Sequence, residues 1–461
     1  MSTNPTRRQA LALGLAACAS QPLLAADEPA FRLATFSAEV TVPLGHPLMA
    51  GGVPPARKIE DPLFIHGVVF IGGGKPVVIA SVDWCEIRND AFDRWRTVLA
   101  EAAGTTPERV LVSSIHQHDT PIADLEAQRI LDRQKATGKI CDLEFHESAV
   151  QRVGKAAREA LKTARRVTHI GVGQAKVEQV ASNRRYVNTD GRPAFNRMSA
   201  TRDSAIRAFP EGIIDPFLKT LSFWDGEQPV AALSAYATHP MSYYGRGEVS
   251  ADFVGLARKR RQADEPKTLQ IYCSGCSGNV VAGKYNDGAP ENRPVLAERM
   301  YVAMTAAWKA TERKPLTMAA FRSVPLRLEP RDSAGFTVAD LTKRLTTDPK
   351  PFGQCLAALG LSWRERADAG HKLDVPVLDF GVAQMLLLPG ESYVEYQLLA
   401  QKQRTESFVF TMGYGESATG YIPTDRHFEE GDRNLHDWCW VAPGSEKALT
   451  AAIEMALKKS S

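Results

Sequence analysis

The sequence predicts an α/β fold: a layered domain with a mixed central sheet flanked by helices. Apolar, β-branched runs of strand length recur along the whole chain, and segments with helical spacing lie between them. Five of the apolar runs end in polar, often glycine-rich residues. Because open α/β sheets bind ligands at the carboxyl ends of their strands, we expect the functional site there.

The first half of the chain supports this layout element by element. Residues 31–41 are a candidate first strand, and a Gly/Pro-rich loop follows. Two β-rich runs joined by residues 72–74, all glycine, predict a hairpin over 63–71 and 76–83. Helical spacing over 92–103 precedes the apolar run at 109–112, which gives a strand–helix–strand order. Further expected elements are a helix over 146–163, a short strand over 167–172 and an irregular, site-lining segment over 181–200.

The second half repeats the pattern of a strand that ends in polar residues. We expect strands over 229–237, 269–272, 377–388 and 408–413, and a helix over 290–311. The residues that follow these strands include His239, the 275–279 loop and Glu391. The chain shows no internal repeat, low-complexity tract or linker-like composition after residue 27, so we expect residues 27–461 to form one folded unit.

Composition excludes several classes of function. The 461 residues are 44% hydrophobic and 24% charged, which is ordinary for a globular protein. A formal net charge of +3 offers no basic surface for nucleic acid and no acidic tail. No stretch after residue 26 is long and apolar enough for a transmembrane helix.

The first 26 residues predict an export signal. Arg7 and Arg8 precede an apolar segment of signal-peptide length, and residues 24–26 offer a small-residue cleavage site. The paired arginines also fit a twin-arginine signal. Residues 15–18 allow the alternative of a lipoprotein box with Cys18 lipidated. We favour cleavage near Ala26, which lowers the net charge to +1 and predicts a periplasmic or secreted protein.

Six cysteines remain in such a mature chain, too few for a disulfide scaffold of this size. Cys273 and Cys276 form a C-x-x-C motif, which is found in redox sites and in halves of zinc sites. Since the chain has no second C-x-x-C motif and no redox-loop context, we favour neither role.

His116 and His118 lie just after the apolar run at 109–112. Strand side chains alternate between faces, so we expect both imidazoles on the same side of a strand end. Such a pair can hold a metal ion, or one imidazole can bind metal while the other transfers protons. The alternative is two loop histidines without a ligand.

Seven short motifs fall in order along nearly the whole mature chain, mostly at predicted strand ends. They are Ser81-Val82-Asp83, residues 114–118, Ser182-Asn183-Arg184, residues 237–242, Ser277-Gly278-Asn279, Leu388-Pro389-Gly390-Glu391 and Gly420-Tyr421. Together they resemble the neutral ceramidases, a family of zinc-dependent amidases that are exported or face the cell exterior. The resemblance is to a divergent bacterial branch.

The resemblance implies one zinc ion and a set of residues around it. The implied zinc ligands are His116, His239, Glu391 and Tyr421, and the implied substrate-facing residues are His118 and Arg184. Imidazole nitrogen and carboxylate oxygen are common zinc ligands, whereas a phenolate is unusual. For each position a structural role is the alternative: a capped strand end at His239, a helix N-terminal acid at Glu391, packing at Tyr421, and a solvated loop charge at Arg184 or Arg185.

Two departures from the family put ceramide specificity in doubt. Ser277 aligns with a serine that lies beside the amide carbon in the family, but the loop here is one residue shorter and lacks an aspartate and a proline. Ser277 therefore either takes part in the chemistry or only lines the pocket. The chain also ends about forty residues after Tyr421, so we expect no C-terminal immunoglobulin-like domain.

These observations predict an exported zinc hydrolase that cleaves a non-peptide amide bond of a small-molecule or lipid-like substrate by metal-activated water. His118 is the expected acid/base, and Arg184 is expected to steady the oxyanion. Ester or lactone hydrolysis at the same site is one alternative. A periplasmic metal- or glycan-binding protein without turnover is the other, suggested by the altered Ser277 loop.

Overall fold

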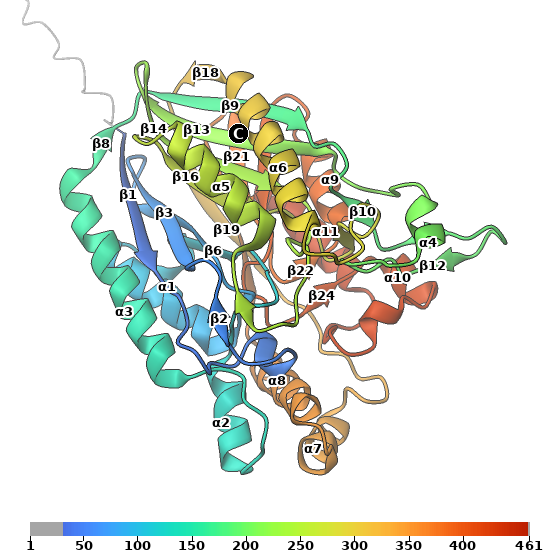
Figure 1. The fold of residues 1–461 in the computed structure, drawn as a ribbon. Coiled ribbons are helices and arrows are strands. Elements are labelled where there is room, and N and C mark those ends of the chain that lie inside the picture. The colour runs from blue at the N-terminus through green and yellow to red at the C-terminus, as the bar shows by residue number, and fades with distance from the viewer. Residues whose placement is uncertain (1–30, 460–461) are drawn as a thin grey trace, which may run out of the picture.

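The strands form three large sheets where we expected one central sheet, and the predicted α/β class is confirmed (Figure 1). The computed structural model describes residues 31–459, so the predicted signal peptide, residues 1–26, lies outside the described residues. The first sheet has the order β6 (Val110–Ser114), β4 (Val77–Val82), β3 (Phe64–Ile71), β1 (Arg32–Glu39), β8 (Arg165–Arg166). The second has the order β16 (Leu269–Ser274), β14 (Gln228–Tyr236), β13 (Phe217–Asp225), β9 (His169–Lys176), β18 (Glu312–Pro315). The third has the order β19 (Ala320–Leu326), β20 (Leu373–Asp379), β21 (Ala383–Leu387), β23 (Phe408–Met412).

Each sheet carries one parallel strand pair at its edge, β4–β6, β14–β16 and β21–β23, and its other pairs are antiparallel. Backbone hydrogen bonds join the carboxyl ends of the three edge strands. Ser114 N donates to Tyr414 O at 3.0 Å, and Gly413 N donates to Ser274 O at 2.8 Å. The carboxyl ends of three parallel pairs therefore meet in one place, as expected for an α/β site.

The faces that the sheets turn toward one another share a single apolar core. Phe70 of the first sheet, Phe223 of the second and Phe380 of the third are packed together, with ring centroids 5.4 to 6.0 Å apart. Full burial of a phenylalanine contributes about 1.5–3 kcal/mol. This core holds the three sheets, and with them the strand ends, in a fixed relation.

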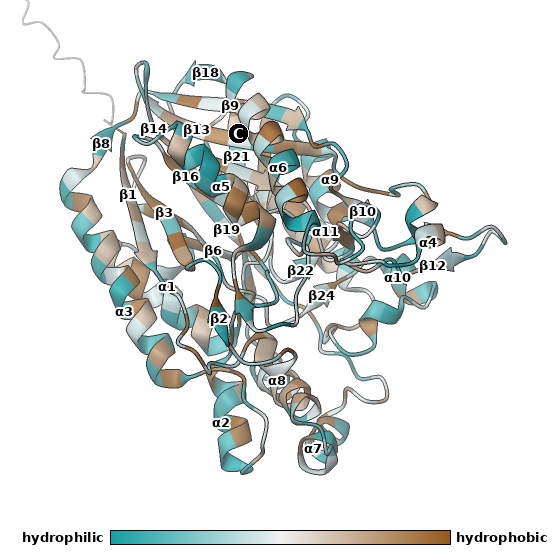
Figure 2. Cartoon of the chain, viewed as in Figure 1, coloured by the Kyte–Doolittle hydropathy of each residue, from teal (hydrophilic) through white to brown (hydrophobic). Residues whose placement is uncertain are grey.

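Helices cover the outer faces of the sheets (Figure 1). The first sheet is covered by α1 (Asn89–Ala103) and α3 (Leu143–Ala160), the second by α5 (Asp252–Asp264) and α6 (Asn292–Lys309), and the third by α9 (Val394–Gln403) and α11 (Ser445–Leu457). Figure 2 shows hydrophilic outer turns on α3 beside largely apolar strands. Among residues 31–459 no helix is long and apolar enough to cross a membrane.

A helical hairpin, α7 (Val338–Thr347) and α8 (Pro351–Asp368), is inserted between the neighbouring strands β19 and β20. Helix α8 packs on α7 and on α2 (Leu125–Arg133). Its middle, residues 355–360, is buried all round. The hairpin was not predicted, and for α8 the reason is that burial on every side removes the amphipathic period by which a helix is recognised in a sequence.

The predicted strand over residues 377–388 is wrong in its bounds, because β20 and β21 form an antiparallel hairpin there. Gly381, with φ 76°, lies in the turn and breaks the apolar run. The remaining elements are short, and several border the site: β2 (Lys58–Ile59), β5 (Glu86–Ile87), β7 (Ile122–Ala123), β10 (Ser182–Asn183), β11 (Tyr186–Val187), β12 (Pro193–Ala194), α4 (Ser204–Ala208), β15 (Glu248–Val249), β17 (Val280–Val281), β22 (Glu391–Ser392), β24 (Tyr421–Ile422), α10 (Asp425–Glu429).

Candidate metal centre

His116 reaches the meeting point of the strand ends through a turn, and not by strand alternation as the sequence predicted. Strand β6 ends at Ser114, and His116 has a left-handed backbone, with φ 67°. Its N–H donates to Trp84 O at 3.0 Å. A non-glycine residue in this conformation costs about 1–3 kcal/mol and persists where the surroundings hold it. The turn places the His116 imidazole, 2% exposed, over the end of the sheet.

His239 and Glu391 are brought to the same point by small two-stranded sheets. β10 pairs with β17, and the His239 N–H donates to Val280 O of β17 at 2.9 Å. β22 pairs with β24 so that Glu391 lies opposite Tyr421. Gly390 has φ 57°, and a side chain there would lie 2.3 Å from Thr419 Oγ1, so the tight turn before Glu391 requires glycine.

Three of the four predicted metal ligands converge. The Glu391 Oε2 atom lies 3.1 Å from His116 Nε2 and 3.1 Å from His239 Nε2, and all three side chains are buried. Their ligand atoms lie within 4.8 Å of one another. This spacing suits one ion placed between two imidazoles and a carboxylate.

The hydrogen bonds of the two imidazoles show which ring nitrogen of each histidine is available to a metal ion. His239 Nδ1 lies 2.7 Å from Ser277 O, and His116 Nδ1 lies 3.2 Å from Cys85 O. A carbonyl oxygen only accepts, so each Nδ1 carries a hydrogen, and Nε2 is the nitrogen of each ring that faces Glu391 and can bind a metal ion. Such outer partners are typical of metal-binding histidines.

Tyr421 and Arg184 form the adjoining part of the site. Arg184 Nη1 donates to the Tyr421 hydroxyl at 2.6 Å, and Arg184 Nη2 lies 3.1 Å from His239 Nε2. The neighbouring Arg185 points elsewhere and forms an ion pair with Glu430 at 2.5 Å. Of the two adjacent arginines, only Arg184 belongs to this site.

His118 lies beside the cluster, with its Nε2 atom 3.4 Å from His116 Nε2. Its Nδ1 atom is buried and has no hydrogen-bond partner among the described residues. The His118 ring also contacts Tyr244 edge-on, with centroids 5.0 Å apart. A buried imidazole nitrogen without a partner is free to exchange a proton with a bound molecule.

The charges of the cluster are strongly coupled. Burial raises the pKa of Glu391, but the two facing imidazoles lower it by more than burial raises it. The net pKa of Glu391 is therefore well below the ordinary value. Burial lowers the pKa of His116, and the Glu391 carboxylate more than offsets this, so the net pKa is raised. Burial and the Arg184 guanidinium lower the pKa of His239 to about 4. The carboxylate stays ionised, which is the state that binds a cation.

A cavity of about 270 Å³ adjoins this cluster. His116, Glu391, His118, Arg184 and Tyr421 line it, whereas His239 is fully buried and is not among its lining residues. The lining also includes apolar side chains, among them Phe352 and Leu356 of α8, and the polar side chains of Arg433, Asn434 and Asp437. The irregular 181–200 segment contributes Met198 and Ser199, in agreement with its predicted site-lining position.

Ser277 does not line this cavity, which corrects the expectation that its side chain faces the pocket. Its hydroxyl is fully buried and bonds to the Tyr414 hydroxyl at 2.7 Å. The Tyr414 ring stacks on His116, with centroids 4.4 Å apart. Ser277 therefore contacts the cluster through Tyr414.

Two residues of the site were missed in the sequence. Glu86 lies 3.7 Å from His116 Nδ1 and forms a fully buried ion pair with Arg88 at 2.8 Å. Tyr414 supports His116 as described. Both follow predicted strands within a few residues, so the position after a strand end is the signal that could have found them. The C-x-x-C cysteines Cys273 and Cys276, like the other described cysteines, are free and buried.

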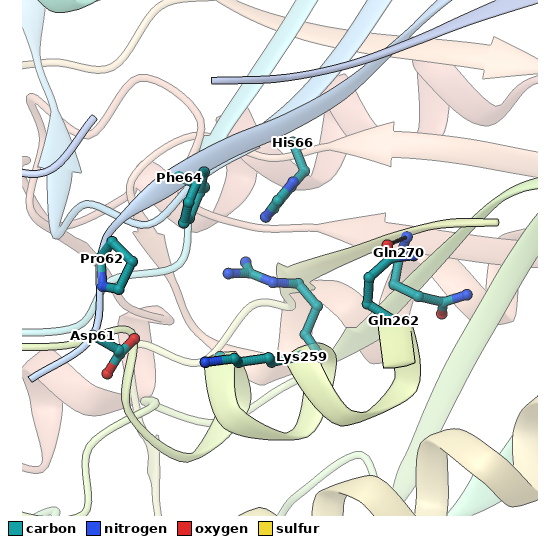
Figure 3. A pocket seen from close by; sticks show the side chains of 9 residues that line it. Asp61, Pro62, Phe64, His66, Lys259, Gln262 and Gln270 are labelled. Atoms are coloured by element: carbon teal, nitrogen blue, oxygen red, sulfur yellow. Dashed lines mark hydrogen bonds between the residues drawn. The ribbon is translucent and has the colours of Figure 1, made fainter. Parts of the chain in front are cut away.

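A second cavity, of about 190 Å³, lies between β3 and α5 (Figure 3). Figure 3 shows His66 projecting from β3 toward the helix that carries Lys259 and Gln262. Beneath it Arg258 binds Asp83 through two hydrogen bonds of 2.6 and 2.7 Å. Asp61 at its edge accepts hydrogen bonds from the Ser250 hydroxyl and from Ala251 N.

The fold is similar to that of solved neutral ceramidases. A ceramidase complexed with C2 superimposes with a TM-score of 0.67 and 15% identity over 93% of this chain and 75% of that chain. The neutral ceramidase from Pseudomonas aeruginosa superimposes with a TM-score of 0.66 and 15% identity, over 94% of this chain and 74% of that chain. No family model and no curated protein matches the sequence. The resemblance predicted from the motifs is thus confirmed at the level of the fold, and at 15% identity the comparison carries no further.

Proposed function

We propose that this chain is an exported metal-dependent hydrolase that cleaves an amide C–N bond, with zinc as the metal. The observation that carries the proposal is the meeting of two imidazole lone pairs and one carboxylate at the junction of the three sheets. The ceramidase-like fold supports the same class of reaction.

The donor set fits a cation. His116 Nε2, His239 Nε2 and Glu391 Oε2 each carry a lone pair, and lone pairs 3.1 Å apart repel unless a proton or metal ion lies between them. Two nitrogens and a carboxylate oxygen are a common catalytic zinc set. Tyr421, opposite Glu391, is the proposed fourth ligand.

A bound zinc ion supplies Lewis acidity and a water of lowered pKa. The chain's own residues supply the rest. Arg184 Nε is buried and has no partner among the described residues, so it is available to donate to the oxygen of a tetrahedral intermediate. His118 Nδ1, also without a partner, is placed to accept a proton and return it to the leaving nitrogen.

Ser277 has a supporting role in this proposal. Because its hydroxyl bonds to Tyr414 and does not line the cavity, it is not placed to attack a substrate. We expect Ser277→Ala to keep its metal and to lose activity only several-fold. Trapping an acyl group on Ser277 with an acylating inhibitor would contradict this role.

The decisive experiment is metal analysis of the purified mature protein, followed by assays before and after chelation on matched amides, esters and lactones. The proposal expects about one zinc per chain and amide cleavage that chelation abolishes and zinc restores. Cleavage of esters or lactones without amides would favour the alternative hydrolase. Stable metal binding without any turnover would favour the non-catalytic alternative.

Export rests on Arg7, Arg8 and the apolar segment after them. Mass spectrometry of the protein recovered from cells tests it through the mature N-terminus. Cleavage near Ala26 is the expected result. An intact N-terminus would rule out signal-peptide cleavage, and a lipid on Cys18 would establish the lipoprotein alternative.

A further inference from the structure

We propose that the substrate is a small amide with one short apolar acyl arm and one anionic arm, of the N-acyl amino acid type. This inference rests on the proposed amidase function and departs from a lipid with two long chains. It is carried by the shape and charge of the cavity above the metal cluster.

The first observation is the size of the cavity. About 270 Å³ is below the range of roughly 300–1,000 Å³ typical of sites for drug-sized ligands. An amide group with a short chain fits this space. A molecule with two long alkyl chains would leave most of its apolar surface in water, and each CH₂ left there forgoes the roughly 0.8 kcal/mol that burial provides.

The second observation is an apolar wall built by the inserted hairpin. Phe352 and Leu356, one turn apart on α8, face the cavity with Met49 and Trp438. The Phe352 ring stacks on Trp438, with centroids 6.3 Å apart and an interplanar angle of 24°. This wall suits an unbranched acyl arm.

The wall is held rigidly. A side chain at Gly52 would lie 2.8 Å from the Phe352 ring, so the ring rests directly on the backbone of Gly52, the residue that caps the Met49–Gly51 turn. Gln354 Oε1 accepts hydrogen bonds from Thr137 N and Gly138 N at 2.9 and 3.1 Å. Because these contacts fix the start of α8, the wall limits the length of the acyl arm.

The third observation is an unpaired cation at the mouth. Arg433 lines the cavity, is exposed, and forms no ion pair with any carboxylate among residues 31–459. The acid beside it, Asp437, is bound to Arg344 of α7 at 3.2 Å. An arginine without a carboxylate partner is suited to a substrate carboxylate, which it binds through two parallel hydrogen bonds.

The test uses the zinc-loaded full chain and compares kcat/KM for four probes: N-hexanoylglycine, its uncharged glycinamide analogue, N-palmitoylglycine and N-palmitoylsphingosine. We expect N-hexanoylglycine to exceed each of the others at least ten-fold. Arg433→Gln should abolish the preference for the charged probe. Phe352→Ala should raise the palmitoyl-to-hexanoyl ratio at least ten-fold by removing the wall.

Two variants serve as matched controls. Arg158→Gln removes another exposed arginine without a recorded ion pair, and Phe321→Ala removes another partly buried ring. Both should keep the wild-type preferences. Efficient cleavage of N-palmitoylsphingosine, or preferences unchanged by Arg433→Gln and Phe352→Ala, would overturn the substrate class while the amidase function stands. If none of the amides is cleaved, both the proposed amidase function and the proposed substrate class are wrong.

Discussion

The cavity lined by His116 and Glu391 and the cavity between β3 and α5 both have buried charges beside them, but the charges are partnered differently. Around the second cavity each carboxylate has its own donors, Arg258 for Asp83 and the Ser250 hydroxyl for Asp61. In the cluster of His116, His239 and Glu391, the carboxylate faces two imidazoles and forms no ion pair with an arginine or lysine among residues 31–459. Buried ionisable groups therefore indicate a ligand where the protein leaves their charge uncompensated, and indicate structure where it completes the pair.

The largest expected effect is a loss of metal affinity, which should follow a substitution in the first cavity and not in the second. Glu391→Gln keeps the shape of the side chain but removes the negative charge that a cation needs. Metal affinity should fall roughly 1,000-fold or more, beyond the 10–100-fold typical of an outer partner. Competition with a chromophoric chelator measures this affinity.

Asp61→Asn is the matched control for this loss, since Asp61 is satisfied by its own donors. It should bind zinc as tightly as the wild type. Equal losses in the two variants would end the distinction between the cavities.

The second effect is the converse, because the Asp83–Arg258 pair should affect the free energy of unfolding and leave the metal affinity unchanged. Asp83→Asn leaves a buried guanidinium without its charge partner and should cost about 3–5 kcal/mol of unfolding free energy. The urea midpoint of the chelated protein measures it. The double variant Asp83→Leu with Arg258→Met removes both charges and should recover most of the loss. A metal affinity lowered as far as in Glu391→Gln would instead place Asp83 in the metal centre.

A smaller effect is expected at Glu86, whose carboxylate lies 3.7 Å from His116 Nδ1 and is paired to Arg88. Glu86→Gln should weaken metal binding about 10–100-fold, as is typical of a partner behind a ligand. The chelator competition applies again. Asp379→Asn, at another buried acid paired to an arginine, should leave the affinity unchanged. An unchanged affinity in Glu86→Gln would restrict Glu86 to the structural pair with Arg88.

The smallest effect concerns Arg185, the neighbour of Arg184. Its hydrogen bond lowers the pKa of Glu430 from the ordinary 4.5 to about 2. A lowered carboxyl pKa stabilises the fold above about pH 4.5, and this contribution is lost as the pH falls toward 2. Arg185→Met should therefore cost less than about 1 kcal/mol at pH 7, and this cost should disappear as the pH falls below about 2, by urea midpoints. A loss of activity as large as that of Arg184→Met would contradict the separation of the two arginines.

Much of the fold was readable because local patterns coincide with the structure. The hairpin of β3 and β4, helices α1, α3 and α6, and the strand before His239 all follow from apolar periodicity and glycine turns. The three residues of the cluster, His116, His239 and Glu391, were also readable, since each comes shortly after an apolar strand.

The sequence alone thus determined many of the strands, though not β13 or β19, together with the polar residues after them and the α/β class. Tertiary structure alone decided that three sheets share one core, that His116 adopts a left-handed turn, and that Ser277 bonds to Tyr414 behind the cluster. It also decided that α8 walls the cavity and that Arg184, not Arg185, enters the site. The physical reason is that side-chain direction at a strand end depends on partners distant in the chain, such as Trp84 O for His116, which no local pattern encodes.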